Sequence, residues 1–138
     1  MRYMMLIYTK EGDLSQMSPE AAQQIRDAHA AVMRETRERG MLVAVNGLGR
    51  TNTATTVRLE AGKVLATDGP FAETKEQLAG YYVLDCVDLD EAIYWAGRIP
   101  SSCGGAQGSI EIRQLVEFEN VPESMLKPHR VAVASVAD

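Results

Sequence analysis

Two segments of the chain are apolar at both odd and even positions. The first, RYMMLIY, covers residues 2–8, and the second, AGYYVLDCVD, covers residues 79–88. Side chains alternate between the two faces of a strand, so this pattern predicts strands that are covered on both faces. We therefore expect both segments to be interior strands of one sheet.

Two helices are predicted from their start and stop signals. Ser18-Pro19-Glu20 supplies an N-cap, a proline at the first helical position and an early acidic residue, and Gly40 is a natural stop. Asp88 and Glu91 form a capping box for a shorter helix that must end before Pro100. The inner face of the longer helix has apolar residues at helical spacing, namely Ile25, Ala28, Val32 and Met33.

The remaining patterned segments predict further strands. MLVAVNGLG at 41–49 indicates a strand that ends in a glycine-rich turn, and TATTVRLEAGKVLATD at 53–68 indicates a hairpin. SIEIRQLVEF at 109–118 alternates, with Val116 among the positions expected to face inward. Periodicity is lost beyond this strand, so we expect one domain at 1–118 and a C-terminal tail at 119–138.

The predicted order is β-α-β, a hairpin insertion, and a second β-α-β. This order is typical of a ferredoxin-like α+β sandwich, in which both helices cover one face of an antiparallel sheet. Several strands are also apolar on the other face, which therefore needs a cover of its own. We expect a homodimer that packs sheet against sheet.

Composition narrows the range of partners. The chain has 138 residues and a mass of 15.1 kDa, which fits a single domain. The formal net charge is −5, and Lys and Arg are scattered singly, so nucleic-acid binding is not expected. The first apolar run is too short for a signal segment or a membrane span, so we expect a cytoplasmic protein without membrane contact. Cys86 and Cys103 form no disulfide or metal-site pattern, and no metal or cofactor is expected.

The motif Asp68-Gly69-Pro70-Phe71 has two interpretations. Gly69 and Pro70 end a strand sharply and leave Asp68 at its tip. In one interpretation the carboxylate accepts backbone N–H groups of the turn, and in the other it faces a pocket. Phe71 would be a wall of that pocket, where desolvation raises the pKa of a carboxylate, or else a core side chain.

Four other residues are candidates for a site. His29 lies at the rim of the inner face of the first helix, where an imidazole is either a packed side chain or an acid–base group. Lys75 follows the turn motif and is the nearest cation in sequence to it, but it also fits a solvated loop. Tyr81 and Tyr82 alternate in direction, so one can enter a cleft between sheet and helix while the other faces a dimer interior.

Four stretches of the chain resemble the DGPF branch of the YCII-related proteins. They are MRYMMLIY, TATTVR, DGPFAETKEQLAGYYVLD and LDEAIYWAGRIP, and the resemblance covers residues 1–118 in order. The resemblance implies a dimeric α+β barrel of ferredoxin-like protomers and small-molecule chemistry like that of a YCII-type dehydrochlorinase. It also implies a regulatory context, because many similar proteins are encoded beside extracytoplasmic-function sigma factors.

The resemblance also implies a histidine on the first helix with an aspartate nearby, and His29 matches by element and position. Similar proteins carry Asp-Pro after the second helix, whereas this chain has Ile99-Pro100, so Asp68 becomes the candidate carboxylate. A His29–Asp68 dyad would transfer protons on a small organic substrate without a cofactor. Phe71, Lys75, Tyr81 and Tyr82 would contact that substrate.

Three functional classes remain open. The first is a cofactor-free enzyme of lyase, isomerase or dehydrochlorinase type. The second is a non-catalytic module that binds a ligand or a regulatory partner such as a sigma factor. The third is a structural dimer. Sequence alone does not decide whether the chain is an enzyme.

Overall fold

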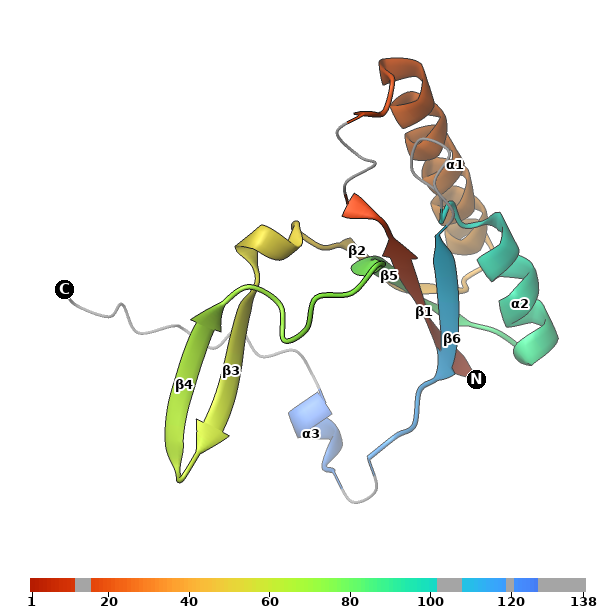
Figure 1. The fold of residues 1–138 in the computed structure, drawn as a ribbon. Helices are drawn as coiled ribbons and strands as arrows, with labels where there is room; N and C mark the ends of the chain where they lie inside the picture. The colour runs from red at the N-terminus through yellow and green to blue at the C-terminus, as the bar shows by residue number, and fades with distance from the viewer. Residues whose placement is uncertain (12–15, 102–107, 119–120, 127–138) are drawn as a thin grey trace.

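The computed structural model describes residues 1–11, 16–101, 108–118 and 121–126 (Figure 1). The strands and helices follow one another as β1 Arg2–Thr9, α1 Pro19–Glu38, β2 Leu42–Gly47, a 3-10 turn Thr51–Thr53, β3 Thr55–Glu60, β4 Lys63–Asp68, β5 Gln77–Asp85, α2 Leu89–Arg98, β6 Ser109–Gln114 and α3 Glu123–Leu126.

The main sheet has four strands in the order β2-β5-β1-β6, and every neighbouring pair is antiparallel. The two segments that are apolar on both faces form β5 and β1, the two interior strands, as predicted. The register sets Met5 opposite both Tyr82 and Ile112, so these side chains share one face. β3 and β4 pair only with each other, as a separate two-stranded sheet. The protein is a mixed α+β structure whose strand order is compatible with a ferredoxin-like fold.

The helix caps follow the sequence signals. Ser18 accepts a hydrogen bond from the Ala21 N–H at 3.1 Å, with Pro19 as the first residue of α1. At the start of α2, Asp88 accepts the Glu91 N–H at 2.9 Å, and the Glu91 carboxylate accepts the Val87 N–H. Both helix starts are therefore fixed by local side chains, independently of the core.

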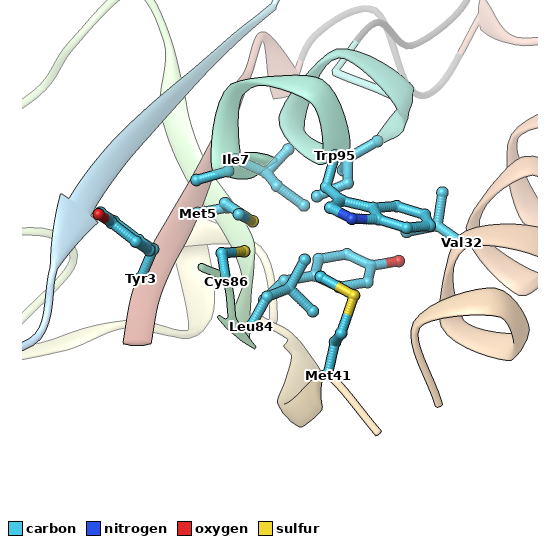
Figure 2. Close-up of a cluster of buried hydrophobic side chains, with 11 residues drawn as sticks. Tyr3, Met5, Ile7, Val32, Met41, Leu84, Cys86 and Trp95 are labelled. Carbon is cyan, nitrogen blue, oxygen red and sulfur yellow. The ribbon is translucent and has the colours of Figure 1, made fainter. Parts of the chain in front are cut away.

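The hydrophobic core lies between the sheet and the two helices. Figure 2 shows Met5 and Ile7 of β1, Leu84 of β5, and Trp95 of α2 meeting Val32 of α1. Other members of this cluster are Tyr3, Met41, Tyr82, Cys86, Ala92 and Ile99. The two helices thus cover most of one face of the sheet.

An ion pair joins the two helices beside this core. Arg98 of α2 donates to both carboxylate oxygens of Glu35 on α1, at 2.6 and 2.8 Å. The hydrogen bond from Arg98 lowers the pKa of Glu35. The Arg98 guanidinium also lies 5.0 Å from the Trp95 ring centre. α1 and α2 are therefore tied together at the edge of the core.

The opposite face of the sheet carries the even positions of β1. Met4, Leu6 and Tyr8 are only half-buried there, unlike the buried odd positions. We call this surface the open face.

One predicted strand position is wrong. β6 ends at Gln114, because the ladder with β1 ends at Tyr3, so Val116 lies beyond the sheet and is 81% exposed. Most of the predicted tail, including 127–138, lies outside the described residues. No described helix is long and apolar enough to cross a bilayer.

Candidate functional site

A cavity of about 380 Å³ lies between α1 and the β2–β5–β1 part of the sheet. Its volume is within the range of small-molecule sites. Its lining consists of Ile7, Thr9, Ile25, His29, Met33, Val45, Asn46, Gly47, Ala79, Gly80, Tyr82 and Pro100. These described side chains include no Asp, Glu, Lys or Arg, so the cavity is mainly apolar, with a few polar groups.

Two of those polar groups form a pair. The Nδ1 atom of His29 lies 2.8 Å from the Tyr82 hydroxyl, and the two rings are nearly parallel with centres 5.9 Å apart. His29 is placed by the helical repeat, four residues from both Ile25 and Met33, which line the same cavity. Tyr82 is placed by strand alternation, on the face of β5 that meets the helices.

Burial keeps both members of the pair uncharged near neutral pH. Desolvation lowers the pKa of His29 and raises the pKa of Tyr82 to about 12. In one tautomer of His29, the Tyr82 hydroxyl donates to Nδ1 and Nε2–H is left as a donor. In the other tautomer, Nδ1–H donates to the Tyr82 oxygen, and the Nε2 lone pair is left to take a proton. In the first tautomer the pair can therefore donate a hydrogen bond to an acceptor on a ligand. In the second it can take a proton from an acidic ligand.

The lowered pKa of His29 predicts a pH-dependent stability. The unfolded chain binds the proton near the ordinary pKa of about 6.5, whereas the folded chain binds it only at lower pH. Stability should therefore be complete above that pH and fall on acidification through it, with a slope of at most about 1.4 kcal/mol per pH unit. Urea unfolding across this range measures the slope. The His29→Gln variant should lack this component, and identical slopes for both proteins would contradict the prediction.

Thr9 is a residue that sequence reasoning missed. It lines the cavity, it is only 4% exposed, and its hydroxyl has no hydrogen-bond partner among the residues that the structure describes. A buried hydroxyl without a partner costs free energy, so such groups often mark a place where another molecule binds. The signal was available, because extending the alternation Tyr3, Met5, Ile7 by two residues puts a threonine on the buried face.

Asp68 lies elsewhere in the chain. It is the exposed last residue of β4, opposite Thr55 in the hairpin, and it does not line the cavity that contains His29. The Gly69 N–H donates to the Ala54 carbonyl, the Thr56 hydroxyl donates to the Gly69 carbonyl, and Gly69 has φ +95°. The neighbouring strand therefore fixes this turn, and the left-handed backbone explains the glycine. A His29–Asp68 pairing stays a prediction.

Phe71 borders a second cavity, of about 550 Å³, at the base of the hairpin. Its ring is 78% exposed, so it is not a core side chain. Tyr8 of the open face and Arg50 line the same cavity.

Lys75 and Tyr81 lie apart from the His29 cavity as well. Lys75 is exposed and lines a shallow hollow with Lys10 and Glu111. Tyr81 points to the face of β5 opposite Tyr82, and its hydroxyl accepts a hydrogen bond from the Asn46 amide at 2.9 Å. The structure thus brings together His29 and Tyr82 of the candidate residues, and it separates the others.

The described residues contain no group of three or more His, Cys, Asp or Glu side chains that could hold a metal ion. Cys86 is buried, and desolvation together with Glu91 and Asp85 raises the pKa of its thiol to about 11. A thiol with such a pKa is a poor nucleophile at neutral pH. Cys103 lies outside the described residues.

Comparison with known proteins identifies the family. The YCII-related domain matches residues 1–119. The chain is also 41% identical, over 119 residues, to the uncharacterized protein R00369 of Rhizobium meliloti (strain 1021). That alignment covers 86% of this chain and 95% of the relative. The chain therefore belongs to the YCII-related family.

Proposed function

We propose that this protein binds an uncharged small organic molecule in the cavity between α1 and the sheet, and that His29 and Tyr82 act on it as an acid–base pair. The observation that carries this proposal is the 2.8 Å contact between His29 Nδ1 and the Tyr82 hydroxyl inside a cavity whose described lining has no formal charge. Such an environment favours neutral ligands, because an ion would lose its hydration without gaining a partner.

The chemistry would be proton transfer at a weakly acidic site of the ligand. His29 takes the proton at Nε2 when Nδ1–H donates to Tyr82, and Tyr82 stabilises the orientation of the ring. Reaction classes that begin with this step include the lyase, isomerase and dehydrochlorinase types expected from the sequence. In a lyase or dehydrochlorinase the electron pair of the broken C–H bond would form a double bond and expel a leaving group, chloride in the latter, and in an isomerase the proton would return to another atom of the ligand. A second candidate, a ligand-binding module without turnover, would use the same cavity. Sigma-factor context remains a prediction of the family resemblance alone.

Binding can be tested with two probes of the same shape, benzamide and benzoate. Benzamide can donate to and accept from the His29–Tyr82 pair, while benzoate brings a charge that has no cation to meet it in this cavity. We expect benzamide to shift the amide resonances of residues 79–82 and to bind about tenfold or more tightly than benzoate. The Tyr82→Phe variant removes one hydrogen bond and should weaken benzamide binding by about threefold to tenfold.

The control for the binding test is Tyr94→Phe. Tyr94 is exposed on α2 and does not line the cavity, so its hydroxyl should not affect benzamide binding. Equal affinity for the two probes, or equal weakening by the two tyrosine variants, would refute the proposed site.

Turnover is tested separately, with exchange of the α-protons of cyclohexanone in D₂O as the readout. A working acid–base pair should speed this exchange at least about tenfold relative to the His29→Gln variant. If benzamide binds but exchange is the same for both proteins, the ligand-binding module without turnover is the better description.

We further infer that the chain belongs to the DGPF branch of its family and forms a homodimer through the open face. The motif Asp68-Gly69-Pro70-Phe71 supports the branch. The half-buried Met4, Leu6 and Tyr8 support the dimer, because apolar strand faces are normally covered. We infer from these arguments and from the resemblance that the dimer is an α+β barrel and that the protein is cytoplasmic.

A further inference from the structure

We propose that one face of the β3–β4 hairpin is a contact surface for a second copy of this chain. This surface, the hairpin face, consists of Val57, Leu59, Val64 and Ala66. It is separate from the cavity that contains His29 and from the open face of the main sheet. The proposal therefore stands independently of the acid–base function.

The register of the hairpin creates this face. Val57 is opposite Ala66, and Leu59 is opposite Val64, so the four side chains project to the same side. The other side carries polar and charged residues together with a single leucine: Thr56, Arg58, Glu60, Lys63, Leu65 and Thr67. Alternation of this kind is typical of a sheet with one buried and one solvated face.

The hairpin face is not buried within the chain. Val57, Leu59 and Val64 are 60%, 73% and 67% exposed. Figure 1 shows the hairpin extending away from the four-stranded sheet and from both long helices. An isolated two-stranded hairpin is at best marginally stable in water. The described residues of one chain do not bury the hairpin face, so another surface is needed to cover it.

A second copy of the chain can cover the hairpin face with its own exposed apolar side chains. Besides the hairpin face, exposed apolar side chains occur at Leu48, Leu115, Val116, Phe118 and Met125, as well as Phe71. With the three large residues of the hairpin face these make nine side chains, each of which removes on the order of 100 Å² from water when buried. If one partner buried all of them together, their sum would be close to the roughly 800 Å² per partner of a stable interface.

Charge also favours an apolar contact between copies. Each copy has a net charge of −5, so two copies repel each other, and contact costs least where the surface carries little charge. The four residues of the hairpin face carry no charge. Asp68 projects to the same side at the end of β4, beyond Ala66, whereas Arg58, Glu60 and Lys63 lie on the opposite side. In a twofold pair, each hairpin would contact the other copy, so the contact forms twice.

The test uses three exposed apolar residues, two on the hairpin face and one on its opposite side. The double variant Leu59→Glu/Val64→Glu places charges on the hairpin face, whereas Leu65→Glu places one on the polar side. Sedimentation and light scattering of the full chain should give a dimer of twice 15.1 kDa for the wild type at micromolar concentration. We expect the double variant to raise the dimer dissociation constant by about 30-fold or more and Leu65→Glu to change it less than about threefold.

A second measurement avoids substitutions. Amide hydrogen exchange of residues 57–66 in the wild type should slow as the protein concentration rises through the dissociation constant. A monomeric wild type, or a dimer whose dissociation constant is the same with and without Leu59→Glu/Val64→Glu, would overturn the proposal. Concentration-independent exchange in the hairpin would overturn it as well. None of these outcomes bears on benzamide binding at His29.

Discussion

Replacing Trp95 by alanine is expected to lower the free energy of unfolding by about 3–5 kcal/mol. The indole is only 1% exposed, and Figure 2 shows it facing Val32 on α1 and the sheet residues below it. The guanidinium groups of Arg39 and Arg98 lie 5.5 and 5.0 Å from the ring centre. Truncation therefore leaves a cavity at the junction of both helices and the sheet, and it removes two cation–π contacts.

Tyr94 is the matched control for this substitution. It is the neighbouring aromatic on α2 and meets Trp95 edge to face at 5.3 Å, but it is largely exposed. Tyr94→Ala should cost less than about 1.5 kcal/mol, because it loses one aromatic contact and little buried area. Urea denaturation of both variants gives the comparison. Equal losses would mean that α2 does not pack through the face described above.

The substitution Gly108→Ala is expected to destabilise the protein by about 3 kcal/mol or more, at the upper end of overpacking effects. A Cβ at this position would overlap the Ser101 carbonyl oxygen and lie 2.6 Å from the Tyr8 carbonyl oxygen. Both obstacles are backbone atoms, so no side-chain rotation relieves the contact. The chain before β6 would have to move away from β1.

The same substitution at Gly97 should have the opposite sign. Gly97 lies inside α2, and a Cβ there would meet no atom within 4 Å. Alanine should therefore stabilise the helix by about 0.5–1 kcal/mol. Thermal unfolding of the two variants should show melting temperatures displaced in opposite directions. A melting temperature of Gly108→Ala that equals or exceeds that of the wild type would show that Gly108 is not held against the Ser101 and Tyr8 carbonyls, and a lowered one for Gly97→Ala would contradict the open space at Gly97.

Local signals in the sequence were sufficient to predict much of the fold. The caps at Ser18 and Asp88 depend on residues three positions apart, and the double apolar pattern of β1 and β5 directly reflects their interior position. The end of β6 could not be predicted, because the alternation continues to Val116 while the ladder ends where β1 ends. Strand length is set by the partner strand, which the local pattern does not contain.

The candidate site was predictable only in part. The helical repeat places His29 at the rim of the inner face of α1, and the structure adds Tyr82 as its hydrogen-bond partner, 53 residues away in sequence. That contact depends on how α1 crosses the sheet, which no local pattern specifies. The hairpin face was visible in the alternation of Val57 and Leu59, but its exposure was not, because exposure depends on where the whole hairpin lies.

The most direct test of the central claim is a crystal structure of the protein soaked with benzamide. We predict ligand density between α1 and β5, with the amide group within hydrogen-bonding distance of the His29 ring or the Tyr82 hydroxyl. Benzamide bound only elsewhere, with the cavity at His29 empty or closed by side chains, would contradict the account.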